Sequence, residues 1–216
     1  MKKLLILAMA FAACGCSGNK SANPLFNDFS APFGIAPFAE ITIEDYREGL
    51  LKGMEEQKAE VEAIIANPEA PTFENTIVAL DQCGELLRKV RGVFSPLSSS
   101  NSSDEMRALE KELSPLFSAH SDDINLNEAL FARVKAVYES RETLDLTAEE
   151  LKVLENQYKR FVNSGAELNA EQKARLRELN SQLSMLQLNF SQNLLHETNN
   201  TFVVVESIEE LAGLPE

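Results

Sequence analysis

The chain has 216 residues, of which 44% are hydrophobic and 25% are charged, and its 34 acidic and 20 basic side chains give a formal net charge of −14. This composition is sufficient for a packed core and excludes a disordered chain, and the length predicts one domain or part of one. This negative charge excludes electrostatic binding to nucleic acid or to anionic lipid headgroups, because both require a basic surface on the protein.

Residues 1–16 have the order typical of a bacterial export signal. Two lysines precede an apolar run that is too short to span a bilayer, which takes about 20 residues. Small residues then lead into Cys14 and Cys16. This order predicts lipoprotein processing, with Cys14 as the preferred lipidated residue and Cys16 as the alternative. We therefore expect a membrane-anchored protein on the periplasmic or cell-surface side; an ordinary signal peptide that is cut nearby is the other interpretation.

Residues 17–40 are predicted to form a tether followed by a Pro/Phe-rich segment that leads into the helical body. Prolines interrupt any helix there. Since so many aromatic rings should not lie in water, we expect the segment to run extended across the helices and to contact them through its rings. An exposed patch for a partner is the alternative. The residues concerned are Pro24, Pro32 and Pro37, with Phe26, Phe29, Phe33 and Phe38 between and after them.

Residues 41–216 are predicted to be helical almost throughout, which makes the fold class all-α. Apolar residues recur at steps of three and four. Helix ends are expected at Asn67-Pro68, at Ser95-Pro96 and at Ser164-Gly165. A polar turn is expected at residues 98–103, shortly after Ser95-Pro96. The expected N-caps are Thr42, Thr72, Ser102, Thr147, Asn169 and Ser207. The clearest apolar stripe comprises Leu176, Leu179, Leu183, Leu186, Phe190 and Leu194.

One segment departs from the helical pattern. Residues 201–206 are β-branched and aromatic and predict a short strand. A lone strand cannot satisfy its own backbone, and the sequence offers no convincing second strand. Residues 207–216 then begin a further capped helix. The pattern indicates a fold that these residues do not complete; a short edge hairpin is the alternative.

Candidate catalytic residues are few. Cys83, the single cysteine outside the signal, lies at helical spacing with apolar residues and predicts a buried, inert thiol. His120 precedes two acids that could orient it as a base or a metal ligand, although a hydrogen bond at a helix end is the favoured interpretation. His196 begins a stretch similar to H-E-x-x-H, but Asn200 occupies the second histidine position and is a poor zinc ligand. No catalytic, cofactor-binding or metal-binding residue is therefore assigned.

Many stretches of the chain resemble the N-terminal region of bacterial peptidyl-dipeptidases, which belong to the thimet-oligopeptidase-like zinc metallopeptidases. The resemblance covers nearly everything after the signal, although no single motif in it is catalytic. The stretches are residues 23–25, 32–34, 37–38, 67–77, 113–115 with His120 and Asp122, 126–127, 130–134 and 161–166, continued by Asn193, Glu197 and Asn199.

This resemblance implies a two-lobed, all-helical body around a deep channel into which short peptides thread. In the family, two histidines of H-E-x-x-H and a downstream glutamate hold zinc, the zinc-bound water attacks the peptide bond, and dipeptides are released from the C-terminal end. None of these ligands has a counterpart in this chain. The resemblance therefore implies the N-terminal lobe that walls the channel, truncated before the catalytic region and inactive in isolation.

Two other functions are open at this stage. The chain could be a stand-alone helical lipoprotein that serves as a binding or scaffold module, with the stripe at residues 176–194 pairing with a partner helix. It could also bind peptides without cutting them, in which case its acidic surface would favour basic peptides.

Overall fold

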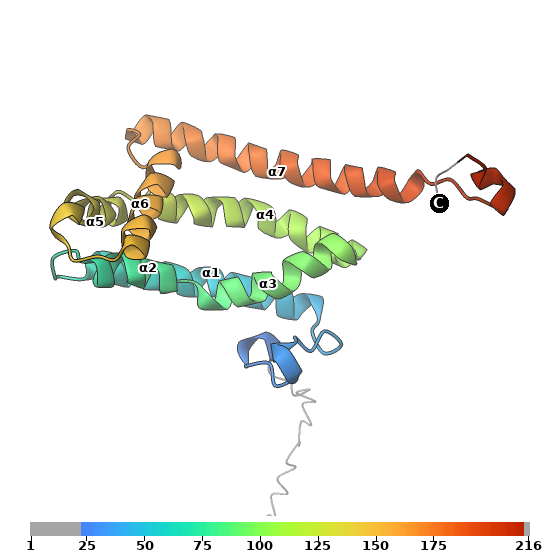
Figure 1. Ribbon diagram of the computed structural model, residues 1–216, viewed down its shortest axis with the longest axis horizontal. Helices are drawn as coiled ribbons and strands as arrows, with labels where there is room; N and C mark the ends of the chain where they lie inside the picture. Colours follow the sequence, from blue (N-terminus) through green and yellow to red (C-terminus); the bar gives the residue numbers. More distant parts are fainter. Residues whose placement is uncertain (1–22, 214–216) are drawn as a thin grey trace, which may run out of the picture.

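The structure, a computed structural model, describes residues 23–213, and these residues form a bundle of α-helices joined by short 3-10 and π-helical turns (Figure 1). The predicted all-α class is confirmed. The predicted signal at residues 1–16, with Cys14 and Cys16, lies outside the described residues, as do residues 17–22 of the tether. No helix within the described range is both long and apolar enough to cross a membrane.

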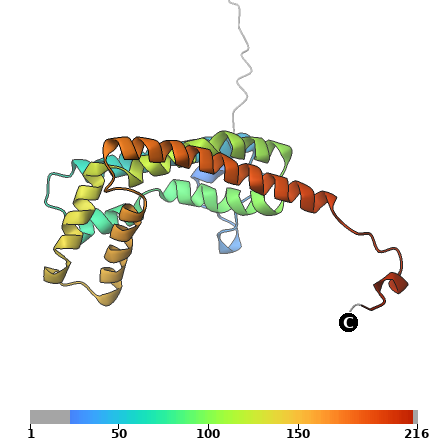
Figure 2. The same ribbon diagram turned by 90° about the horizontal axis from the view of Figure 1, so that it is seen from above.

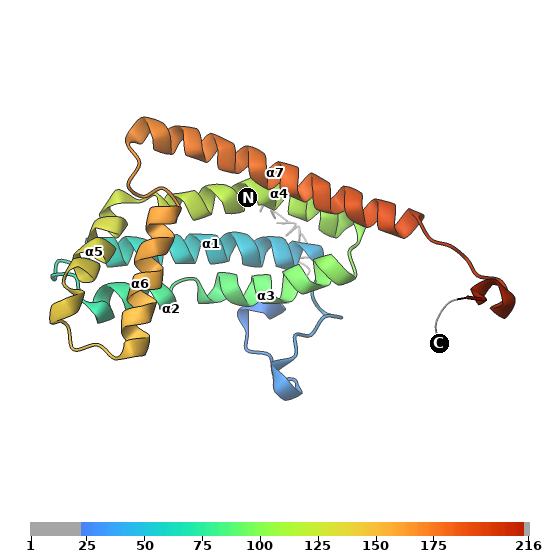
Figure 3. The ribbon, with the colours of Figure 1, turned by 45° about the horizontal axis from the view of Figure 1, so that its top comes forward.

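The helices form layers. Helices α1, α3 and α4 lie lengthwise beside one another, α5 and α6 gather at one end of them, and α7 runs along α4 and projects beyond the other end (Figures 1 and 3). The α-helices are α1 (Ile43–Ala66), α2 (Ala79–Gln82), α3 (Glu85–Ser100), α4 (Asp104–Asn125), α5 (Glu128–Glu139), α6 (Ala148–Asn163) and α7 (Ala170–Asn200). The shorter turns are η1 (Pro24–Phe26), η2 (Pro32–Gly34), the π-helical η3 (Phe73–Val78), η4 (Arg141–Thr143) and η5 (Ile208–Leu211).

Most of the predicted helix starts are confirmed. Helix α4 begins one residue later than predicted, because Ser103 rather than Ser102 accepts a hydrogen bond from the Met106 amide, at 3.2 Å. Ser207 makes no capping bond, and only the short 3-10 turn η5 follows it. The reciprocal capping boxes join Thr42 with Asp45, Thr72 with Asn75, Thr147 with Glu150 and Asn169 with Gln172.

The prediction that a helix ends at Ser95-Pro96 is wrong, because α3 continues to Ser100. Pro96 has no N–H to donate to the carbonyl of Gly92, one turn earlier, but Gly92 is exposed and its carbonyl can bond to water. Burial of Ser98 in the last turn further favours the helical continuation. The other two predicted ends hold: α1 stops at Ala66 and α6 at Asn163.

The strand predicted near residues 201–206 is also wrong. This segment has no regular secondary structure, and no strand lies elsewhere in the described part of the chain with which it could pair. A strand needs a neighbour to satisfy its backbone groups, so β-branched composition alone is not sufficient. The segment leads away from the end of α7 into solvent, and Val203 is 90% exposed (Figure 2).

Two hydrophobic clusters stabilise the body, and α1 contributes to both. The α3–α4 cluster comprises Leu25, Ala36, Tyr46, Leu50, Met54, Leu87, Val90, Val93, Phe94, Met106, Leu109 and Leu113. The α5–α6 cluster comprises Val61, Ile64, Phe73, Ile77, Leu80, Cys83, Ile124, Leu130, Phe131, Val134, Val137, Leu154, Phe161 and Ala166. Gly53 lets α1 approach α3 closely, since a Cβ there would lie 2.7 Å from the Leu87 Cα.

The Pro/Phe-rich segment contacts the body as predicted, but only through part of its residues. Leu25 is fully buried, and the Lys52 and Lys89 ammonium groups lie 4.1 and 4.6 Å from the ring centroids of Phe26 and Phe29. Phe33, by contrast, is fully exposed at the turn of η2, where its φ of +63° directs the chain away from the helices. The segment is thus anchored near its start and free at its middle.

Candidate functional site

Helix α7 is attached to the body by its polar face. The Lys173 ammonium lies 3.0 Å from a Glu128 carboxylate oxygen, and the Arg177 guanidinium lies 2.8 Å from that of Asp123. Within the described residues of α7, the single buried one is Lys173. Leu176, Met185, Leu188 and Leu195 are half-buried and add apolar contacts to these ion pairs, whereas the other large apolar residues of the helix are exposed.

The apolar stripe of α7 faces solvent. The side chain of Phe190 is 69% exposed and that of Leu186 is 65% exposed. The clearest apolar pattern in the sequence thus lies outside both hydrophobic clusters of the body. We call this surface the α7 stripe; it comprises Leu179, Leu183, Leu186, Phe190 and Leu194. Exposure continues beyond the helix at Phe202, Val203, Val204, Val205, Ile208 and Leu211.

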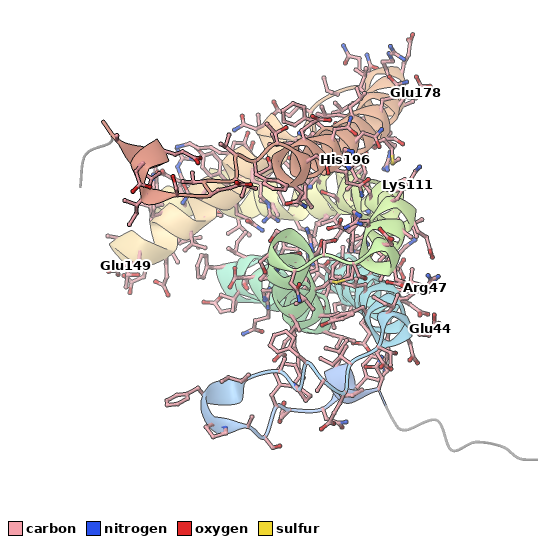
Figure 4. The ribbon with its side chains drawn as sticks, turned by 90° about the vertical axis from the view of Figure 1, so that its right-hand side faces the viewer. Glu44, Arg47, Lys111, Glu149, Glu178 and His196 are labelled. Carbon is pink, nitrogen blue, oxygen red and sulfur yellow. The ribbon has the colours of Figure 1, made fainter. Side chains whose placement is uncertain are left out.

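Figure 4 shows α7 end-on above α4, with side chains projecting from it on the sides away from α4. A contiguous apolar surface of this kind marks an interaction site in soluble proteins. Its spacing of three and four residues fits a partner that packs along the helix.

A groove of about 560 Å³ lies between α3, α4 and α7. Asp122, which lines it, is buried, and its carboxylate accepts a hydrogen bond from the Asn180 amide at 2.7 Å. Burial raises the pKa of this carboxyl above its usual value. The groove is rich in hydroxyl groups, so it can bind polar groups. Its serines are Ser95, Ser114, Ser118, Ser121, Ser184 and Ser191.

Two of the stretches that carry the family resemblance, residues 67–77 and residues 130–134, meet in space. Arg133, in residues 130–134, is buried and donates hydrogen bonds to the backbone carbonyls of Asn67 and Glu69 at 3.0 and 3.3 Å, and to the Asn75 side chain at 3.1 Å. It thereby fixes residues 67–77 against α5. These residues of the resemblance have a structural role: they fasten the turn between α1 and η3.

His120 does not cap a helix end as predicted. It lies inside α4, and its Nε2 is 2.8 Å from the Gln57 side-chain oxygen of α1. Burial lowers the pKa of the imidazole, which outweighs the opposite effect of nearby Asp123. His120 is therefore a neutral, hydrogen-bonded residue between two helices.

Cys83 is buried, as predicted, but it sits at a break in the helix rather than within one. It follows α2, and Gly84 with φ +75° starts α3. Its thiol donates to the Ala79 carbonyl at 3.2 Å, and burial raises its pKa to about 11. Such a thiol is a poor nucleophile.

His196 lies on the projecting end of α7, where Figure 4 labels it. Its Nε2 is 2.9 Å from the Asn200 amide, so the two residues at H-E-x-x-H spacing do face one another. An amide nitrogen or oxygen is a poor zinc ligand. Within residues 23–213 no three His, Cys, Asp or Glu side chains come together as a metal site. The residues present thus do not fit a zinc ion.

The helical architecture and the sequence together define the class of this protein. Residues 48–173, from α1 to the first turn of α7, match the family model described as neurolysin/thimet oligopeptidase, N-terminal domain. The chain therefore belongs to the neurolysin/thimet oligopeptidase family and contains its N-terminal domain.

Among its relatives, the chain is similar to the dipeptidyl carboxypeptidases of Escherichia coli K12, with 38% identity, and of Salmonella typhimurium LT2, with 39% identity. It is 31% identical to oligopeptidase A of Haemophilus influenzae. Each of these alignments covers 90% of this chain and 28% of the relative. The chain thus spans less than a third of the length of the proteins it matches.

Of the features of the site, the sequence predicted the exposed stripe only in the alternative of a binding module, and it did not predict the role of Arg133. The outward orientation of the α7 stripe had one available signal, since Lys173, Arg177 and Asn180 recur at helical spacing and form a polar face that could have been assigned to an interface. The role of Arg133 had none, because its partners are backbone carbonyls about sixty residues away.

Proposed function

We propose that this chain is the N-terminal, channel-walling part of a zinc metallopeptidase that acts on short peptides and releases dipeptides from their C-terminal end. The names of two similar proteins, dipeptidyl carboxypeptidase and oligopeptidase A, support a peptidase. The observation that carries the proposal is the α7 stripe, because an isolated domain has no reason to expose Leu186 and Phe190 on a helix that is otherwise attached to the body.

In this proposal the chain encloses and selects peptides, and it breaks no bond itself. The zinc ion and its ligands belong to the part of the enzyme that corresponds to the remaining length of the relatives. The serine-rich groove supplies hydroxyl groups that can bond to an extended peptide backbone. The α7 stripe and the exposed residues 202–205 supply the apolar surface on which the catalytic part rests.

We further propose that the intact protein is exported and held at a membrane. The argument is the order of residues in the first sixteen positions, which ends in Cys14 and Cys16. A chain with a net charge of −14 is repelled by anionic headgroups, so a covalent lipid is the suitable anchor. Mass spectrometry of the membrane-extracted protein tests this directly: a diacylated N-terminal cysteine supports it, and a soluble, unmodified N-terminus opposes it.

Fragment complementation tests the enzymatic proposal. This chain is mixed with the part of E. coli dipeptidyl carboxypeptidase that follows its matched region, and cleavage of a short peptide is measured with and without a metal chelator. We expect activity only with both parts present, and a loss of that activity with the chelator. The variant Phe190→Asn should restore much less activity than the matched control Gln182→Ala on the same helix. Chelator-sensitive cleavage by this chain alone would overturn the proposal.

The alternative, a stand-alone binding or scaffold module, is also favoured by the α7 stripe, which could pair with a helix of a partner or of a second copy. Analytical ultracentrifugation distinguishes the binding module from the peptidase part. A defined, well-folded dimer that the Phe190→Asn variant converts to monomer supports the module. A loosely associating species that complementation brings into a stable complex supports the peptidase.

A further inference from the structure

The arginines of this acidic chain are unevenly paired. Most of them form ion pairs with carboxylates, as expected where acidic side chains outnumber basic ones by 34 to 20. The paired ones are Arg47, Arg107, Arg141, Arg175 and Arg177. Within residues 23–213, the others, Arg88, Arg91, Arg133 and Arg160, are in no ion pair. Arg133 is buried among backbone carbonyls, so three exposed guanidinium groups lack a carboxylate partner.

The same pocket is lined by these three arginines, of which Arg91 also lines the serine-rich groove. The pocket has a volume of about 430 Å³, within the range of small-ligand sites, and we call it the arginine pocket. Arg88 and Arg91 come from α3 and Arg160 comes from α6, while His120 and Gln57 enter from α4 and α1. Asp81 is the one carboxylate among its described lining residues. Three cations and one anion thus line this concave site, an excess of positive side chains on an otherwise negative molecule.

Two of the arginines are held in place before any ligand arrives. The Arg91 guanidinium lies 4.8 Å from the ring centroid of Phe117, which leaves its N–H edge free. Arg88 donates to the carbonyls of Asp81 and Cys83 at 3.4 and 3.3 Å through one nitrogen only, Nη1. Guanidinium groups fixed in this way lose little entropy on binding and match the two oxygens of a carboxylate.

We propose that the arginine pocket binds a carboxylate of a peptide, either the C-terminal carboxylate or that of an Asp or Glu side chain. Arg91, held against Phe117, binds its oxygens together with Arg160, the fixed Arg88 adds positive charge beside them, and Gln57 and Gln157 bond to the neighbouring amides. Peptides that carry a carboxylate are thus preferred at this site, contrary to the preference for basic peptides that the net charge by itself predicts. The inference takes only the peptide nature of the ligand from the proposed function.

Nuclear magnetic resonance on the full chain tests this with three probes. The first is N-acetyl-trialanine, with a C-terminal carboxylate; the second is N-acetyl-Ala-Glu-Ala amide, with a side-chain carboxylate; the third is N-acetyl-Ala-Gln-Ala amide, with neither. We expect saturable shifts of the His120 ring signals with the first or second probe, at a Kd of about 1 mM, and none with the third. The probe that binds identifies the source of the carboxylate.

The variants Arg91→Gln and Arg160→Gln should each weaken this binding about tenfold. The matched control is Arg175→Gln, which removes the same charge from an exposed position of α7. Equal binding of the Gln peptide, equal weakening by the control, or no saturable shift while circular dichroism shows an intact fold would each overturn the proposal. None of these outcomes depends on peptide cleavage, so the failure of this inference is distinguishable from the failure of the proposed function.

Discussion

Helices α1 and α7 have 24 and 31 residues, start with a reciprocal capping box, and carry apolar residues at helical spacing. In α1 these residues are buried, and residues such as Leu50 and Ile64 belong to the two hydrophobic clusters. In α7 the corresponding residues face solvent, and the helix is attached through Lys173, Arg177 and Asn180. Periodicity therefore predicts that a helix has an apolar face, but the position of the remaining chain decides what that face meets.

The largest expected effect tests this difference directly. Leu50→Ala removes a fully buried side chain of α1 and should lower the free energy of unfolding by about 2 to 5 kcal/mol. The same truncation in α7, Leu186→Ala, should change it by less than about 0.5 kcal/mol, because little apolar area is lost from the interior. Urea denaturation of both variants measures the contrast, and comparable losses would show that α7 is buried in solution.

The next effect concerns the turn that leads out of α1. Arg133→Met keeps the volume of a buried side chain but leaves the Asn67 and Glu69 carbonyls without their donor, so the free energy of unfolding should fall by about 1 to 3 kcal/mol. Arg175→Met on α7 removes only an exposed ion pair and should cost about 0 to 1 kcal/mol. Thermal unfolding followed by circular dichroism compares them; equal shifts would contradict the assigned role of Arg133.

Close packing of α1 against α3 gives a third test. Gly53→Ala places a Cβ 2.7 Å from the Leu87 Cα, so the helices must separate, at about 1 to 3 kcal/mol. Gly92→Ala, on the outer side of α3, meets no atom within 4 Å and should stabilise the helix by about 0.5 to 1 kcal/mol. The two variants should thus change the free energy of unfolding in opposite directions. A Gly53→Ala variant with an unchanged free energy of unfolding would refute the close approach of α1 and α3.

The pH dependence of stability should carry the signature of His120, which joins α4 to α1. Because burial lowers the pKa of its imidazole, the unfolded chain binds more protons between that lowered pKa and the ordinary value near about 6.5. Stability due to His120 is thus present at neutral pH and is lost as the pH falls through this window. Asp122, whose pKa is raised by burial, acts in the opposite direction.

The comparison needed is therefore between wild type and His120→Gln, which can keep the bond to Gln57 but cannot titrate. Denaturant unfolding from about pH 7 to about pH 5 should show a steeper loss of stability in the wild type. Parallel curves would show that His120 has an ordinary pKa and is accessible to water.

The smallest effect on stability belongs to the α7 stripe. Leu186→Gln and Phe190→Gln together should leave the unfolding free energy within about 0.5 kcal/mol of wild type, because both side chains are exposed. They should nevertheless reduce self-association in sedimentation velocity, since the apolar surface is lost. A clear loss of stability in the double variant would place the stripe against the body.

Much of the fold followed from local sequence signals. The capping boxes of Thr42, Thr147 and Asn169 were predictable because a cap involves residues only three positions apart. The end of α6 was predictable for the same reason: Gly165, with φ +94°, lets the Ala166 and Gly165 amides bond back to Phe161 and Val162.

The predictions that failed concern residues whose conformation depends on distant neighbours. Pro96 remains helical because burial of the last turn outweighs the local effect of proline. Residues 201–206 form no strand because the described chain offers them no partner. The arginine pocket could not be foreseen either, since Arg91, His120 and Arg160 come from three separate helices.

The sequence by itself determined the helical class, the positions of most helix ends, and the resemblance that led to the peptidase family, because these depend on residues close together in the chain. Only the tertiary structure decided that α7 docks on α4 through the face that carries Arg177 and Asn180 and that the α7 stripe is exposed. The physical reason is that burial depends on how the whole chain packs. An amphipathic pattern specifies two helix faces, and the contacts of Lys173 and Arg177 determine which of the two faces packs against the body.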